Sequence, residues 1–154
     1  EVAGSIVEYA AKHGVKRVIS IGGYSTGKIN EHRKVFAVVG QKVLVEEFKK
    51  AGIIFGETKG AIVGAAGLIP ALAKLKGMEG ACIMGETHGS YVDAVSARNV
   101  IGALEKLIGF TVDISELDKQ AKEGEKIIKK IEEEVQKQVI TPYNPEERNV
   151  SYIR

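Results

Sequence analysis

Residues 17–27 read RVISIGGYSTG, and residues 81–89 read ACIMGETHG. Each stretch is a short apolar run that passes directly into a glycine-rich segment. Such runs bounded by glycine indicate buried strands, so we expect strands at residues 16–21 and 80–84. The two glycine-rich segments should then lie at the carboxyl edge of one sheet, where open α/β sheets usually place their ligand or partner sites.

The flanking sequence alternates helical and extended patterns. Further short β runs are expected at residues 35–39 and 53–55. The expected helices cover, besides an N-terminal one that ends at Gly14, residues 41–50, 61–75 and, after an Asp93 cap, 94–107. This alternation predicts an α/β fold with a largely parallel sheet flanked by helices.

Composition excludes several classes of protein. The chain has 154 residues, 44% of them hydrophobic and 27% charged, which fits one globular domain. No apolar run approaches the length of a membrane span, and a net charge of +2 gives no basic footprint for nucleic acid. The single cysteine, Cys82, cannot form an internal disulfide and suits a reducing, cytoplasmic setting. Abundant Lys and Glu without Trp point to a heat-adapted source.

The C-terminal third differs from the rest. A charged helix is expected from Ser115 to about Gln138, with a narrow apolar seam of candidate oligomer contacts at Ile128, Ile131 and Val135. Docking of this seam on its own domain is the alternative. We expect a single α/β domain over residues 1–138, lacking its N-terminal portion because the chain opens inside a helix, and a flexible tail over residues 139–154.

Two segments are candidate ligand loops. Residues 22–28, GGYSTGK, nearly match a phosphate-binding P-loop through Gly22, Gly23 and Lys28, but Ile29 stands where the motif needs a magnesium-binding Ser or Thr. A tight turn at the end of a strand is the other interpretation.

The second candidate loop is residues 85–89, in which Glu86 and His88 could support acid–base chemistry. Two possible ligands do not make a metal site, so no metal and no cofactor are expected. A pairing of Cys82 with His88 would need a sharp return of the chain, since six residues of strand span roughly 20 Å. Structural roles for these residues remain the alternative.

Taken in order, four segments resemble the archaeal branch of the proteasome assembly chaperone family, whose eukaryotic homologue is proteasome assembly chaperone 2. They are IGGYSTG at 21–27, GAIVGAAGL at 60–68, LAKLKG at 72–77 and GETHG at 85–89. The resemblance implies a nucleoside-phosphorylase-like three-layer sandwich that forms a homo-oligomer and binds proteasome core-particle α subunits. It also implies a further N-terminal strand–helix region that is absent from these residues.

The resemblance further implies a docking tail. Such chaperones often insert a C-terminal tail that ends in a hydrophobic residue, tyrosine and any residue. Here the chain ends with Val150, Tyr152, Ile153 and Arg154, with tyrosine third from the end instead of second. An extended tail with these apolar anchors and a terminal carboxylate could still dock on a partner.

Three functional hypotheses follow. The first is a non-enzymatic, homo-oligomeric chaperone or adaptor of the proteasome core particle. The second is a nucleotide- or small-molecule-binding enzyme, of ATP-grasp-ligase or phosphorylase-like type, that uses the two candidate loops. The third is an oligomeric scaffold with another partner, built on the seam of the charged helix.

Overall fold

The computed structural model describes residues 1–28, 30–56 and 62–139. The chain divides into two compact units, Glu1–Ala121 and Lys122–Arg154. The first unit holds the sheet and the helices packed on it. The described part of the second unit is the carboxyl-terminal portion of helix α5 (Ser115–Val139).

A three-stranded sheet forms the centre of the first unit. Its strands β1 (Arg17–Ser25), β2 (Val35–Val39) and β3 (Glu79–Thr87) lie in the order β1-β3-β2. β1 runs parallel to β3, whereas β2 runs antiparallel to it. The sheet is therefore mixed, not largely parallel as predicted, because the chain turns back between β1 and β2 and brings β2 along β3 in the opposite direction.

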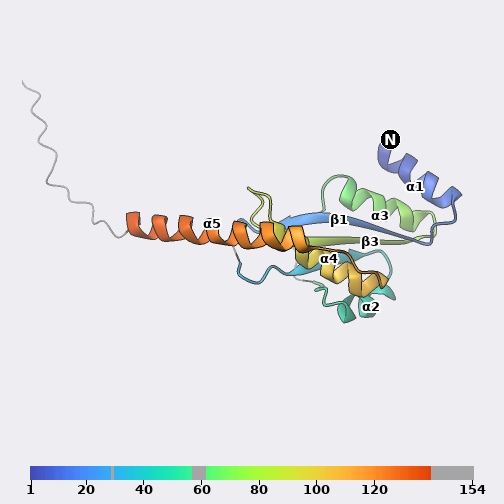
Figure 1. The fold of residues 1–154 in the computed structure, drawn as a ribbon. Coiled ribbons are helices and arrows are strands. Elements are labelled where there is room, and N and C mark those ends of the chain that lie inside the picture. Colours follow the sequence, from blue (N-terminus) through green and yellow to red (C-terminus); the bar gives the residue numbers. More distant parts are fainter. Residues whose placement is uncertain (29, 57–61, 140–154) are drawn as a thin grey trace, which may run out of the picture. The chain divides into compact units, whose positions relative to one another are not determined.

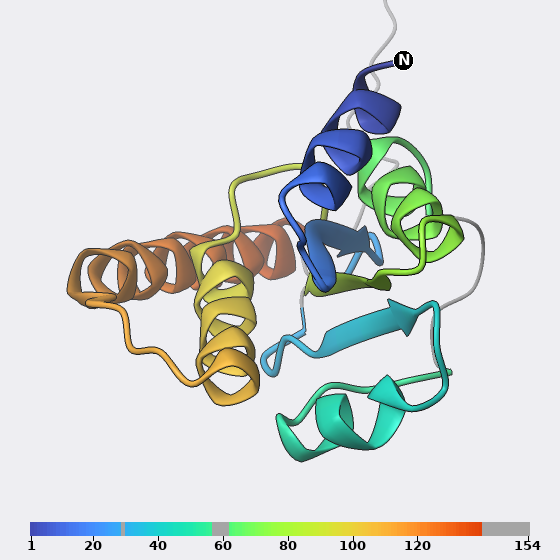
Figure 2. The ribbon, with the colours of Figure 1, turned by 90° about the vertical axis from the view of Figure 1, so that its right-hand side faces the viewer.

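Helices cover both faces of this sheet, as Figures 1 and 2 show. α3 (Ala65–Leu75) packs on β1 and β3, and α1 (Val2–Lys12) packs on α3. On the opposite face, α4 (Ala94–Ile108) packs on β2 and β3, and α2 (Leu44–Lys50) packs on β2. The predicted α/β fold with a helix-flanked sheet is thus confirmed.

β3 is buried on both faces because it is the central strand. Successive strand side chains point to opposite faces of a sheet. Ala81 and Ile83 accordingly join the larger apolar cluster with α4, and Cys82 and Met84 join a separate cluster with Phe36. A strand buried on both sides has no polar face, which is why its sequence reads as one apolar run instead of an alternation.

Most expected elements form with shifted ends. Asp93 accepts a hydrogen bond from the Ser96 backbone N–H at 3.0 Å and caps α4, and Gly109 ends the helix with φ of 76°. The expected strand at residues 53–55 is reduced to a single bridge between Ile54 and Phe36. The expected helix at residues 41–50 begins only at Leu44.

An ion-pair cluster joins the amino-terminal ends of β1 and β3 to α2. The Arg17 guanidinium donates to both carboxylate oxygens of Glu47, at 2.7 and 2.8 Å, and to Glu79 at 2.7 Å. The hydrogen bond from Arg17 lowers the pKa of Glu47, and burial only partly opposes this effect. Bidentate Arg–carboxylate pairs fix geometry as well as charge, so this cluster sets how α2 meets the sheet.

Candidate functional site

The first residues of the two glycine-rich segments, at 22–25 and 85–87, lie within strands and not in loops. Gly22 and Gly23 pair with Met84 and Gly85 in the β1–β3 ladder, and the Thr26 N–H extends the ladder with a bond of 2.9 Å to the Thr87 carbonyl. The strand expected to end at residue 21 therefore continues to Ser25. The main-chain pairing with β3 accounts for this extension.

Gly85 allows α4 to approach β3 closely. A Cβ atom at this position would lie 2.2 Å from the Ser96 hydroxyl and 2.9 Å from the Val100 side chain. Real Cβ atoms essentially never make non-bonded contacts shorter than 3.0 Å, so glycine is the residue that fits at position 85. This packing role explains the glycine where the sequence suggested a ligand loop.

Lys28 lies in the exposed turn after β1, where its backbone N–H donates to the Thr26 hydroxyl at 3.4 Å. The described residues between this turn and β2 form no helix. A P-loop needs a helix whose amino terminus meets the phosphates. The local geometry around Lys28 therefore favours the tight-turn interpretation.

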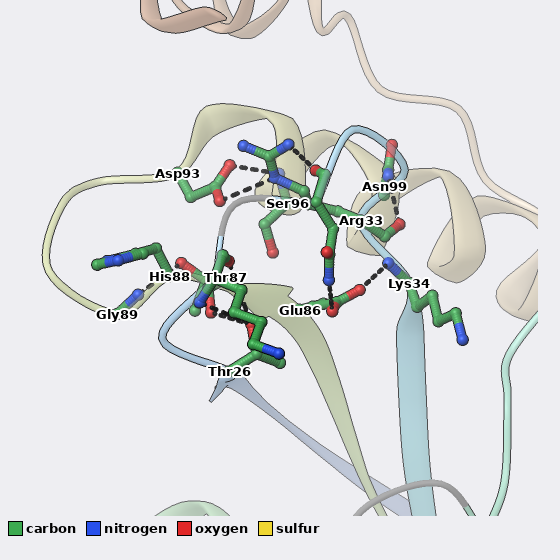
Figure 3. A network of polar contacts seen from close by, with 12 residues as sticks. Thr26, Arg33, Lys34, Glu86, Thr87, His88, Gly89, Asp93, Ser96 and Asn99 are labelled. Carbon is green, nitrogen blue, oxygen red and sulfur yellow. Dashed lines mark hydrogen bonds and ion pairs between the residues drawn. The ribbon is translucent and has the colours of Figure 1, made fainter. Parts of the chain in front are cut away.

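Polar side chains converge at the carboxyl edge of the sheet, as Figure 3 shows. Glu86, at the end of β3, is only 5% exposed. Its carboxylate accepts hydrogen bonds from the Asn30 side-chain amide and from the Lys34 backbone N–H, the latter at 3.0 Å. Because a buried carboxylate is costly without such donors, Glu86 anchors the segment that connects β1 to β2.

Arg33 and Asp93 form a buried ion pair next to Glu86. The Arg33 Nε–H donates to the Asp93 carboxylate at 3.2 Å, and the two side chains are 4% and 5% exposed. Burial disfavours the charged guanidinium, but the hydrogen bond and negative charge of Asp93 outweigh it, so the pKa of Arg33 is raised. The Arg33 carbonyl also accepts from the Asn99 side chain at 2.8 Å. The pair thus fixes the β1–β2 connection to the start of α4.

His88 lies apart from Glu86. Figure 3 shows the His88 side chain directed away from Glu86, toward the loop that precedes α4. Its ring stacks on Tyr91 with centroids 5.6 Å apart, and its Nδ1 atom is buried without a hydrogen-bond partner among the described residues. The structure therefore does not bring these two residues together as an acid–base pair. Cys82 is 1% exposed and packs with Phe36 and Met84.

A cavity of about 390 Å³ lies between β1 and α4 beside this polar cluster. Its apolar walls come from β1 and α4, and its polar groups come from the residues around the start of α4. The lining residues are Ile21, Gly22, Gly23, Thr87, Tyr91, Asp93, Ser96, Ala97, Val100, Ile101 and Leu104. A Cβ atom at Gly23 would lie 3.3 Å from the Thr87 side chain, so the missing side chain at Gly23 leaves part of this space open.

Sequence reasoning missed Arg33, Asn30 and Asn99, and assigned Asp93 only a capping role. The sequence did carry one signal for this polar cluster. Glu86 ends an apolar run that predicts a buried strand, and a second carboxylate, Asp93, follows at the cap of the next helix. Within the described residues, no group of three or more His, Cys, Asp or Glu side chains could hold a metal ion. None of the described helices is long and apolar enough to cross a membrane.

The remaining predicted contacts belong to the C-terminal part of the chain. On α5, Ile131 is 55% exposed and Ile128 is partly buried. The side chain of Val135 and the tail residues Val150, Tyr152, Ile153 and Arg154 lie outside the described residues.

Comparison with known proteins gives matches over most of the chain. Residues 1–132 match the model of the PAC2 family. The uncharacterized protein MJ1210 of Methanocaldococcus jannaschii is 36% identical over 154 residues, which cover 99% of this chain and 60% of that protein. The chain thus spans about three fifths of the length of this relative.

Two solved archaeal structures share the fold. PbaB of Pyrococcus furiosus, described as an archaeal proteasome activator, is 37% identical with a TM-score of 0.77, over 86% of this chain and 57% of that one. PbaA of the same organism, described as an archaeal homolog of proteasome-assembly chaperone, is 27% identical with a TM-score of 0.73, over 89% and 57%.

Proposed function

Since the chain belongs to the PAC2 family, we propose that it is a non-enzymatic chaperone or adaptor that binds proteasome core-particle subunits and assists their assembly or activation. The observation that carries this proposal is the 37% identity to PbaB over 86% of the chain. PbaA and PbaB are both described in terms of the proteasome, and the four glycine- and alanine-rich segments of this chain resemble the same family.

The finer features of the proposal come from the sequence. We propose α-type subunits as the partner surface, the tail residues Val150, Tyr152, Ile153 and Arg154 as the docking element, and a cytoplasmic, heat-adapted setting. A homo-oligomer built on Ile128, Ile131 and Val135 is part of the same proposal. The nucleoside-phosphorylase-like sandwich, the domain over residues 1–138 and the flexible tail over 139–154 also remain proposals.

The architecture of the carboxyl edge supports binding more than catalysis. Arg33 is paired with Asp93, and the Glu86 carboxylate is occupied by Asn30 and Lys34. These groups hold the β1–β2 connection to β3 and to the start of α4. A polar cluster satisfied within the protein suits a rigid platform for a partner.

Co-sedimentation with purified archaeal core particles tests the proposal. The intact chain is compared with a form truncated after Gln138 and with the double substitution Tyr152→Ala and Ile153→Ala. Glu146→Ala with Glu147→Ala serves as the matched control in the same tail. Binding that disappears with the tail and with Tyr152 and Ile153, but survives the control, supports both partner and docking element.

Other outcomes of this experiment are equally decisive. Binding by the truncated form would support the proteasome core particle as the partner but would place the contact within residues 1–138. Absence of binding by the intact chain, and by a longer form matched in length to PbaB, would contradict the chaperone proposal.

The cavity between β1 and α4 favours one competing function, a small-molecule binder. A ligand present at 100 times its dissociation constant stabilises a protein by about 2.7 kcal/mol, which raises the melting temperature. The proposed chaperone should show no shift across a panel of nucleotides at millimolar concentration. A reproducible shift that is lost in Ala97→Leu, which enlarges an exposed residue of the cavity lining, would favour the binder instead.

A further inference from the structure

Helix α3 leaves part of strand β2 uncovered on its side of the sheet. α3 packs on β1 and β3, and Figure 2 shows α1 and α3 toward the β1 end of the sheet, with β2 at the opposite end. Val38 of β2 pairs with Cys82 of β3, so the two side chains point to the same face. Cys82 is 1% exposed, whereas Val38 is 46% exposed. The layer formed by α3 therefore ends between β3 and β2.

A second cavity, of about 240 Å³, lies where this layer ends, between α3 and the end of β2. Its walls come mainly from apolar and glycine residues of α3, β2 and β3. Lys74 is the one charged residue among the described residues that line it. Sites for small molecules are usually larger, about 300–1,000 Å³. An apolar side chain of a larger partner therefore suits this cavity better than a whole small-molecule ligand.

The apolar surface continues from the cavity over the outer side of α3. Leu68 and Leu75 are 50% and 80% exposed. Ala71, which lines the cavity and is exposed, lies between them at helical spacing. Lys74 is the one charged residue of this helix, and helices that are apolar nearly all round are normally buried. Since α1 packs on a different flank of α3, the flank that carries Ala71 and Leu75 has no cover within the described residues.

The charges around this surface have one sign. The Gln41 side chain donates to the Met78 carbonyl at 2.9 Å, so it ties the chain after β2 to the chain after α3. Lys42 and Lys76 flank this junction and are exposed. Neither they nor Lys74 form an ion pair with another described residue. The apolar surface is therefore bordered by lysines whose charges are available to a partner.

We propose that the α3–β2 face, which comprises Val38, Leu68, Ala71, Leu75 and the cavity beside them, docks a protein segment whose apolar side chains are flanked by carboxylates. One apolar side chain of the segment fills the cavity, others cover the two leucines, and the carboxylates pair with the lysines. A second copy that met this face about a twofold axis would bring Lys74 close to its own counterpart, so the charges favour an acidic partner over self-association.

This inference goes beyond the proposed proteasome function. It assigns a contact to the folded α/β unit and makes no use of the tail residues. It also holds for any protein that supplies an apolar segment with flanking carboxylates, so its test does not require core particles.

Titration of the chain with two fluorescently labelled peptides tests the inference. Both peptides carry the same core of leucines, which is flanked by glutamates in one peptide and by lysines in the other. Fluorescence anisotropy should show saturable binding of the acidic peptide, at least about tenfold tighter than that of the basic peptide at low ionic strength. The difference should shrink as salt is added, because the lysines are exposed. Amide chemical shifts of Val38 and Ala71 should move with the acidic peptide.

Matched substitutions separate this face from the rest of the surface. Leu75→Glu and, independently, Lys74→Glu should each weaken binding of the acidic peptide by at least about tenfold. Neither should change the melting temperature, because both side chains are exposed. Val43→Glu and Lys50→Glu are the controls, because they make the same kinds of change at exposed positions near and in α2.

Four results would overturn the inference. They are no binding of the acidic peptide, equal binding of both peptides, an equal loss in the control variants, and a dimer that Leu75→Glu dissociates in sedimentation velocity. The last result would assign the face to a second copy of this chain.

Discussion

A Cβ atom placed on Gly80 would lie 2.1 Å from the carbonyl oxygen of Pro70 and 2.8 Å from its carbonyl carbon. Both are backbone atoms of α3, which cannot move aside as a flexible side chain could. Because glycine has no Cβ atom, α3, a helix rich in alanine and glycine, can pack this closely on β3. Pro70 is buried inside that helix, and the carbonyl of Ala66, which receives no N–H from Pro70, accepts a hydrogen bond from the Ser20 hydroxyl instead.

Gly80→Ala should therefore destabilise the fold by about 3 kcal/mol, at the upper end of the range for overpacked cores. Gly102→Ala is the matched control, because Gly102 lies inside α4 with no atom within 4 Å of a new Cβ. That change should stabilise the protein by about 0.5–1 kcal/mol through helix propensity. Urea denaturation measures both, and equal effects would contradict the packing argument.

The buried ion pair gives a second prediction. Asp93→Asn keeps an acceptor for the helix cap but leaves the Arg33 guanidinium buried without a counter-charge, which typically costs about 3–5 kcal/mol. Glu116→Gln is the control, since the Lys119–Glu116 pair is 72% and 75% exposed and should matter by less than about 0.5 kcal/mol. Thermal and urea unfolding report the difference. A cost for Asp93→Asn as small as that of the control would show that the pair is solvated in solution.

The Arg17–Glu47 pair predicts a pH dependence of stability. The pKa of Glu47 is lowered in the folded state by its hydrogen bond to Arg17. The pair's contribution is therefore fully present above the unfolded pKa, about 4.3, and is lost as pH falls through the lower folded value. Because the Glu47 side chain is 42% exposed, the contribution should stay within about 1 kcal/mol.

The measurement is the difference in unfolding free energy between the wild type and Glu47→Gln across pH. This difference should be constant at neutral pH and shrink toward zero in acid. Lys49→Gln, which breaks the exposed Lys49–Glu46 pair on the same helix, controls for the loss of one surface charge. A difference that grows on acidification would have the wrong sign for a lowered pKa.

The seam on α5 predicts an effect on assembly. If Ile128 and Ile131 contact another subunit, Ile128→Glu and Ile131→Glu should dissociate the oligomer without unfolding the protomer. Ile127→Glu is the control, because it makes the same change at a neighbouring position that is 58% exposed and outside the seam. Sedimentation velocity and far-UV circular dichroism together decide the case. Loss of folded protomer in place of dissociation would mean that the seam packs within one chain.

The sequence predicted the elements whose signals are local. The Asp93 cap and the Gly109 stop define α4, and the apolar run of β3 marks a strand buried on both faces. These features depend on neighbouring residues only, so they can be read from the chain directly. The family resemblance depended on the order of four segments and was confirmed by the PAC2 match.

Features that depend on distant residues were not predictable in the same way. Gly22, Gly23 and Gly85 looked like loop residues because glycine is common in turns, but pairing between β1 and β3 and the approach of α4 hold them in strands. The antiparallel direction of β2 was missed because helix–strand alternation carries no information on direction. The Arg33–Asp93 pair joins residues 60 positions apart, which no periodicity can indicate.

The order of synthesis follows from the central position of β3. Arg17 meets Glu79 across 62 residues, and Lys34 meets Glu86 across 52. Both outer strands therefore leave the ribosome long before the strand that joins them exists. Until residue 87 is available, β1 and β2 have no sheet to enter, and their apolar side chains stay exposed on the nascent polypeptide. Folding of the sheet should consequently wait for the synthesis of β3, whatever the order in which the outer strands are made.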